Sequence, residues 1–258
     1  MTAITAATFN EVVKCNVYRR DASMTALPVN RKLIFGVDQS FHAFDVLIGS
    51  LPTPTDEATG NFYPIVTAIS RVAMKNYATL RQAFDDDSYD LLAWSCRNLL
   101  ELDIFMKYVL MSKANADEFA THRLIDGLEI AEHLQEFDLH ANPSPINDLD
   151  FTIGELKQKM AAEGMLLSRR LSTRQWAKIV HMGEDYDAVN KVCSKLIHPT
   201  AWAILTEGVG SDLFPEAREI FYGSGARYFM DIFVSIKEHI RQYGVNHKRW
   251  TRTASSKP

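Results

Sequence analysis

Residues 87–113 have the sequence DSYDLLAWSCRNLLELDIFMKYVLMSK. Wound as a helix, this segment carries apolar side chains on nearly every side, which is typical of a helix buried in the core of a domain. One face nevertheless holds Asp90, Arg97 and Glu101, interleaved with Trp94 at the spacing that stacks side chains along a helix. Because a charge inside a core is costly unless it is paired, this polar row is the first candidate for a functional site.

The composition of the 258 residues is that of an ordinary globular domain, with 47% hydrophobic and 23% charged residues. The net charge is −4, so binding to nucleic acid would need a local basic patch rather than an overall positive field. The three cysteines are widely separated and are expected to be reduced. No signal-peptide pattern starts the chain and no apolar run reaches the roughly 18 residues of a membrane span, so we expect a cytoplasmic protein that makes no membrane contact.

Apolar residues recur at helical spacing through most of the chain, and prolines and glycines divide it into segments. We therefore predict an all-α, single-domain helical bundle of about seven helices, with the helix over 88–113 buried at its centre. Residues 1–36 are expected to form a loosely structured N-terminal arm, residues 37–244 the bundle domain, and residues 245–258 a basic, disordered tail. The stretch 138–150 contains two prolines and is predicted to be a surface loop.

Two helix boundaries can be placed from individual residues. The acidic run Asp85–Asp87, followed by Ser88, precedes the central helix and is expected to cap it, because the N-terminus of a helix favours negative charge. Pro199 ends the helix predicted from Glu184 to His198, because the residue before a proline is pushed out of the helical conformation. We expect this later helix to pack against the central one.

The central helix supplies the first candidate site, the pair Arg97-x-x-x-Glu101. One interpretation is an internal salt bridge that fixes how the helices pack. Arginine before glutamate is the less favourable order for an i, i+4 pair, which indicates that one or both side chains have a further partner on another helix. The functional interpretation is that a guanidinium held by carboxylates in a dry cleft grips a phosphate or stabilises a developing negative charge.

The helix before Pro199 supplies the second candidate site, a row formed by Asn190, Ser194 and His198 at i, i+4 and i+8. His198 ends this helix, where the dipole favours the protonated imidazole and raises its pKa. One interpretation is that His198 only caps the C-terminus of the helix. The other is that it acts as a general acid or base, because imidazole titrates near neutral pH.

Other common site patterns are missing from the sequence. The histidines and cysteines show no metal-ligand spacing, and the glycines form no phosphate-binding loop, so we expect neither a metal nor a cofactor. Trp176 lies within a basic cluster made of Arg169, Arg170, Arg174 and Lys178. Such a cluster is either a solvated helix face or a surface that follows a nucleic-acid backbone and stacks a base on the tryptophan.

Over roughly residues 89–203, two motifs resemble an uncharacterised bacterial family of all-helical domains. The motifs are Trp94-x-x-Arg97-x-x-x-Glu101 and, following Tyr186, Ser194-x-x-x-His198-Pro199-Thr200. More remotely, Arg97-Asn98 on a buried helix is similar to the HEPN domains, compact helical bundles that include metal-independent ribonucleases of toxin and phage-defence systems. Those enzymes have a catalytic histidine shortly after the arginine on the same helix, whereas here it would have to be His198 from another helix.

The resemblance implies a HEPN-like domain that associates with RNA or nucleotides. In its enzymatic form, such a domain would be a metal-independent nuclease of a toxin or phage-defence type. In that case His198 would act as acid or base, Arg97 would bind phosphate, and Glu101 would orient one of them. Contacts to the substrate are expected from the polar side chains nearby, which are Ser194, Asn98, Lys195 and Asn190. The alternative is a non-enzymatic helical scaffold, working through a protein partner or as a homo-oligomer, in which Arg97, Glu101 and His198 form a structural network.

Overall fold

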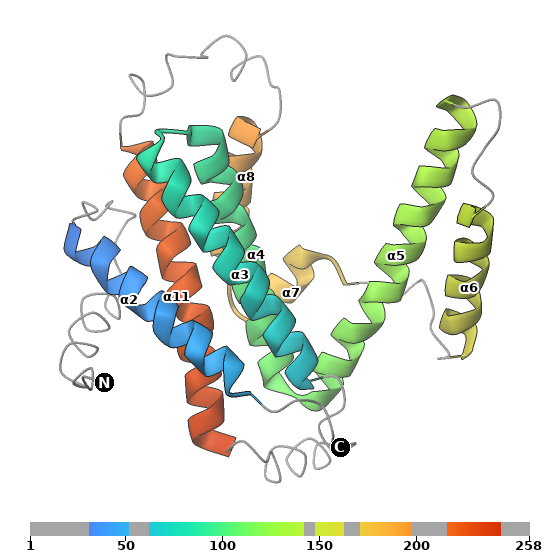
Figure 1. The fold of residues 1–258 in the computed structure, drawn as a ribbon, viewed down its shortest axis with the longest axis horizontal. Helices are drawn as coiled ribbons and strands as arrows, with labels where there is room; N and C mark the ends of the chain where they lie inside the picture. The colour runs from blue at the N-terminus through green and yellow to red at the C-terminus, as the bar shows by residue number, and fades with distance from the viewer. Residues whose placement is uncertain (1–30, 52–61, 142–147, 163–170, 198–215, 244–258) are drawn as a thin grey trace.

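A computed structural model describes residues 31–51, 62–141, 148–162, 171–197 and 216–243 of the chain (Figure 1). These residues form helices and no strands, so the predicted all-α bundle is confirmed. No helix among them is both long enough and apolar enough to cross a membrane. The eight helices in the described ranges are α2 (Arg31–Gly49), α3 (Phe62–Asp85), α4 (Tyr89–Met111), α5 (Lys113–Ala141), α6 (Asp148–Ala162), α7 (Thr173–Ile179), α8 (Gly183–Ile197) and α11 (Ala217–Tyr243).

Helix α4 lies at the centre of the bundle, as predicted. It contacts α3, α5, α7, α8 and α11, which explains why its apolar residues do not keep to one face. Its buried side chains point in several directions around the helix axis and include Leu92, Leu99, Leu100, Ile104 and Met106. Burial of each such side chain contributes roughly 1.5–3 kcal/mol, so the packing around α4 stabilises the bundle substantially.

Three helices come close together at Gly225 of α11. A Cβ atom at this position would lie 2.7 and 3.2 Å from the two methyl carbons of Leu80 on α3, and 3.4 Å from the Cα atom of Cys96 on α4. Leu80 is fully buried and has little room to move aside. The absent side chain of Gly225 therefore lets α11 pack directly against the α3–α4 pair.

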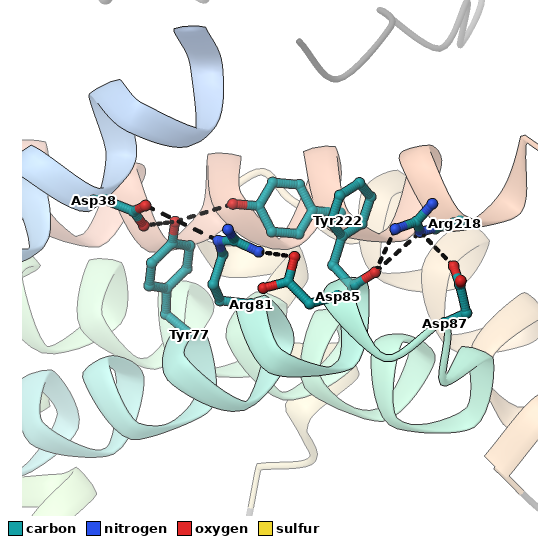
Figure 2. Close-up of polar contacts among 8 residues, drawn as sticks. Asp38, Tyr77, Arg81, Asp85, Asp87, Arg218 and Tyr222 are labelled. Carbon is teal, nitrogen blue, oxygen red and sulfur yellow. Dashed lines mark hydrogen bonds and ion pairs between the residues drawn. The ribbon is translucent and has the colours of Figure 1, made fainter. Parts of the chain in front are cut away.

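Polar side chains also join α2, α3 and α11, as Figure 2 shows. The Tyr77 hydroxyl of α3 donates to the Asp38 carboxylate of α2 at 3.1 Å and lies 3.1 Å from the Tyr222 hydroxyl of α11. Arg81 pairs with Asp85 one turn further along α3 and reaches Asp38 at 4.0 Å. Burial raises the pKa of Tyr77 far above its usual range, so the hydroxyl stays protonated and keeps its hydrogen to donate.

The turn between α3 and α4 is held by Arg218 of α11 (Figure 2). Its guanidinium donates to the Phe84 carbonyl oxygen at 2.6 and 3.1 Å, pairs with the Asp87 carboxylate at 2.9 Å, and stacks 4.0 Å above the Phe84 ring. Asp87 has the left-handed backbone angle φ of 52°. Ser88 occupies the predicted N-cap, but its hydroxyl donates to Asp90 and makes no cap hydrogen bond. Asp85 and Asp87 therefore form ion pairs with Arg81 and Arg218. The prediction that Ser88 caps α4 through its side chain is wrong.

Helices α5 and α6 form a hairpin, here called the arm, which extends away from the other helices (Figure 1). The arm has a small core of its own, separate from the main core, made of Leu124, Ile125, Leu128, Ala131, Ile153, Leu156 and Met160. Because α5 continues to Ala141 and α6 begins at Asp148, the predicted loop over 138–150 is shorter than expected. At the N-terminus, α2 begins at Arg31, although residues 1–36 were expected to be loosely structured. Residues 1–30 and the predicted tail lie outside the described residues.

We predict that Gly225→Ala destabilises the protein by about 1–3 kcal/mol, because the added methyl group overpacks the contact with Leu80. Gly154→Ala on α6 is the matched control, since a Cβ there would meet nothing within 4 Å. Alanine favours a helix over glycine, so this control should gain about 0.5–1 kcal/mol. Urea unfolding followed by circular dichroism measures both changes. Equal stability of Gly225→Ala and the wild type would mean that α11 does not approach α3 this closely.

Candidate functional site

Helix α8 packs against α4 in the antiparallel direction, as two contacts show. Lys107 Nζ on α4 lies 3.3 Å from the sulfur of Met182, just before α8, whereas the buried thiol of Cys96 meets that of Cys193 near the other end. The predicted packing of these two helices is therefore confirmed. It brings the two candidate rows of polar residues onto the same side of the bundle.

The ion pair on α4 lies at this contact with α8. Arg97 Nε is 3.1 Å from Glu101 Oε1, and the two side chains are 28% and 23% exposed. Both act on Tyr186 of α8: burial chiefly, and then Glu101, raise the pKa of its hydroxyl, while Arg97 opposes them. Tyr186 is thus an electrostatic neighbour of the pair on a second helix, but neither Arg97 nor Glu101 forms a hydrogen bond or ion pair with another helix in the described residues, so the predicted further partner is not found there. Asp90 is exposed near the start of α4 and is not part of the Arg97–Glu101 pair.

The second row follows Tyr186 along α8 at helical spacing. Asn190 and Ser194 are half-buried, and the side-chain oxygen of Asn190 is buried without a hydrogen-bond partner in the described part of the chain. Lys195, on the neighbouring face, is exposed. Because the two helices run antiparallel, this row passes the Arg97–Glu101 pair and continues toward the start of α4. His198 lies outside the described residues.

Asn98, predicted to contact substrate, faces α3 instead of α8. Its side-chain nitrogen donates to Asn76 Oδ1 at 3.1 Å, and the nitrogen of Asn76 donates to the Val72 carbonyl oxygen at 2.9 Å. Adjacent residues on a helix point about 100° apart, which explains how Arg97 and Asn98 reach different neighbours. In this arrangement Asn98 ties α4 to α3, so the structure does not bring it to the α8 row.

A cleft of about 1360 Å³ opens beside the site, between the base of the arm and the bundle. Its lining includes Ile65 of α3, Phe105 of α4, Arg123 of α5 and Tyr186 of α8. Tyr186 is therefore shared by the cleft and by the Arg97–Glu101 pair. The cleft is open to solvent and has a mostly apolar lining, so a ligand could enter it without displacing the core.

Helix α7 also lines the cleft, through Thr173, Arg174 and Trp176. A capping box starts this short helix: the Gln175 amide donates to the Ser172 hydroxyl at 3.3 Å, and the Ser172 amide donates to the Gln175 side chain at 2.7 Å. Trp176 is thereby packed among aromatic rings, with centroid distances of 5.1 Å to Phe105 and 4.8 Å to His122.

The environment of Trp176 does not fit the interpretation of the basic cluster as a nucleic-acid surface. Trp176 is only 6% exposed, so it offers no free ring face on which a base could stack. Arg174 is engaged in an ion pair with Asp187, at 2.8 Å. Arg169 and Arg170 lie outside the described residues. The interpretation in which a base stacks on Trp176 is therefore wrong, because this tryptophan is a core residue.

The sequence analysis missed the one fully buried charge of α4, Asp103. Its Oδ2 atom is 2.7 Å from Lys107 Nζ, which also lies 3.9 Å from Asp231 of α11. The other oxygen, Oδ1, is buried and has no hydrogen-bond partner among the described residues. Burial raises the pKa of Asp103 to about 7, although Lys107 acts to lower it. The available signal was the Asp103-x-x-x-Lys107 spacing, the favourable order for a helical ion pair inside an apolar run.

No protein-family model, curated protein or solved structure matches this chain. Within the described ranges, no group of histidine, cysteine, aspartate and glutamate side chains is arranged to hold a metal ion. The chain is therefore described by its own fold and site. It is an all-α bundle that carries a half-buried ion pair beside a row of polar residues and an open cleft.

We predict that ionisation of Asp103 costs stability. Its pKa of about 7 in the folded protein is above the ordinary value of 3.8, so stability is greatest below the ordinary value and falls as pH rises through 7. A shift of this size corresponds to about 4 kcal/mol at most. Asp103→Asn keeps the shape but cannot ionise. Urea unfolding should show that it is more stable than the wild type above pH 7 and less dependent on pH.

The charged groups facing Asp103 are Lys107 on α4 and Asp231 and Arg227 on α11. Asp117→Asn is a suitable control, because Asp117 also forms an i, i+4 pair with a lysine, but is 40% exposed. An exposed pair contributes about 1 kcal/mol or less, so its stability profile should follow that of the wild type. If Asp103→Asn were the less stable protein above pH 7, attraction to Lys107 would outweigh the cost of burial.

Proposed function

We propose that the chain is a HEPN-like helical domain that associates with RNA or nucleotides, with its phosphate contact at Arg97. One observation carries the proposal: the Arg97–Glu101 pair is partly exposed and lies beside the polar row of α8, instead of being sealed inside the core. A guanidinium in such a place can reach a ligand from solvent, while the surrounding helices hold it in position.

Arg97 has the capacity for a phosphate contact. Its Nε atom is engaged by Glu101, and the guanidinium forms no other hydrogen bond or ion pair among the described residues, so the terminal nitrogens remain for an anion. Glu101 fixes the orientation of the guanidinium plane, which suits paired hydrogen bonds to phosphate oxygens. Asn190 and Ser194 add polar groups along the same side, and Lys195 adds a positive charge.

In the nuclease form of this proposal, the chemistry needs no metal ion. His198 removes the proton from a ribose 2′-hydroxyl, whose oxygen attacks the adjacent phosphorus while the 5′-oxygen of the next nucleotide leaves. Negative charge then develops on the phosphate oxygens, and Arg97 stabilises it. The cut leaves a cyclic phosphate on one product, and the departing oxygen takes up a proton.

A non-enzymatic helical scaffold is the second candidate, favoured by a different observation. The arm exposes large apolar side chains, with Ile130 60%, Phe137 72% and Phe151 69% accessible. Apolar surface of this kind is more typical of a contact with another protein than with RNA. In this case the Arg97–Glu101 pair serves to hold α4 and α8 in register.

We predict that Arg97→Ala weakens binding to labelled single-stranded RNA by tenfold or more, because one charged hydrogen-bonding contact to phosphate contributes about 1.5–3 kcal/mol. The melting temperature should change little, since a partly exposed ion pair contributes about 1 kcal/mol or less. Fluorescence anisotropy measures binding to RNA and DNA, and gel electrophoresis with and without EDTA measures cleavage. Arg241→Ala, which removes an exposed arginine paired with Glu238, is the matched control.

His198→Ala separates binding from cleavage, because it should abolish cleavage and leave Arg97-dependent binding in place. Cleavage that stops in EDTA would contradict the metal-independent mechanism. If the wild type binds neither RNA nor DNA, or if Arg97→Ala and Arg241→Ala bind alike, the phosphate site at Arg97 is excluded. A large loss of melting temperature in Arg97→Ala would favour the scaffold.

A further inference from the structure

The α5 helix of the arm has two apolar faces, and only one of them is covered. Leu124, Leu128 and Ala131 are buried against α6. On the opposite face, Ile130, Leu134 and Phe137 are 60%, 52% and 72% exposed. These three residues, which we call the arm stripe, occupy positions i, i+4 and i+7 and therefore lie in a single row along the helix.

The spacing of the arm stripe is that of a seam between two packed helices. Alternating steps of three and four residues place side chains along one line of contact, as in coiled coils and helical bundles. The same spacing continues toward the base of the arm through Gly127 and Arg123, which line the cleft. A helix with apolar residues on two opposite sides is normally sandwiched between other helices. The described residues supply α6 on one side of α5 and no helix over the outer part of the stripe.

We infer that a second copy of this chain covers the arm stripe. The two α5 helices pack antiparallel, so that the four helices of the two arms lie in a row, with each α6 on the outside. A symmetric pair centred on Ile130 places Phe137 of one copy level with Arg123 of the other. The aromatic ring near the tip thus packs on the aliphatic stem of the arginine near the base of the other arm.

Charge supports the same arrangement. Arg123 has no ion-pair partner among the described residues, and in the antiparallel pair it comes next to Glu136 of the other copy. Glu136 itself has only a 3.6 Å contact with His133, and both of those side chains are more than 70% exposed. Two symmetry-related pairs of opposite charge would therefore flank the apolar contact, which fixes the antiparallel direction.

The size of the stripe sets the strength of the pair. Its three side chains expose roughly 300–400 Å² per copy, if a large side chain has about 150–250 Å² to bury. Because apolar atoms make up a little over half of a typical interface, the whole contact covers roughly 600 Å² per copy, which is the lower end of the range for specific pairs. We therefore expect a reversible dimer that depends on protein concentration.

Sedimentation velocity of the full chain from about 1 μM to about 300 μM tests this pairing, since that range brackets a reversible dimer. The wild type should shift from monomer to dimer. Phe137→Glu and Leu134→Glu should weaken dimerisation by at least about tenfold, because each places a charge in the apolar contact. Phe151→Glu is the matched control: Phe151 is 69% exposed but lies on the side of α6 away from the arm core, and its dimerisation should equal that of the wild type.

Circular dichroism of each variant checks that the helices and the melting temperature are retained. A wild type that stays monomeric over the whole series overturns the inference, and so does a dimer that Phe137→Glu and Phe151→Glu affect equally. The arm stripe contains none of the residues proposed to contact RNA. Loss of dimerisation in Phe137→Glu with unchanged RNA binding would therefore leave the proposed function untouched.

Discussion

The burial of α4 on several sides is the constraint on which the rest of the structure depends. Five helices pack around it, and each takes its place from the apolar surface that α4 offers in its direction. A helix covered on most of its sides has little surface left for unpaired charge, so its buried polar groups lower stability unless they find partners. Arg97 finds Glu101, Asn98 finds Asn76 of α3, and Asp103 finds Lys107 for one of its two oxygens.

The fold class could be predicted because helical periodicity is strong and local. The apolar residues of α4 recur around the whole helix, which predicts correctly that it is central. The same pattern could not show that α5 would leave the bundle. Its apolar residues are divided between the α6 contact and the arm stripe, and a sequence read one helix at a time does not distinguish a covered face from an exposed one.

The candidate site could be predicted in part. The order of Arg97 and Glu101 indicated a partner on another helix, but the two residues bond to each other within α4, and Tyr186 of α8 is an electrostatic neighbour only. The residue type could not be foreseen, because it depends on the antiparallel register that Cys193 and Met182 set against α4. Asp103 was missed for the opposite reason. Its partner lies on the same helix, but its burial depends on helices such as α11, which only the assembled bundle brings against α4.

Arg218 and Phe84, which hold the α3–α4 turn against α11, are 134 residues apart in the sequence. During synthesis on the ribosome, α3 and α4 leave the exit tunnel long before α11 exists. Their common apolar surface must wait, exposed, for the last helix, and closing so long a segment carries an entropic cost before any contact with α11 is gained. A truncation before α11 would therefore leave the apolar surface that α4 buries against α11 exposed, and such a surface promotes aggregation.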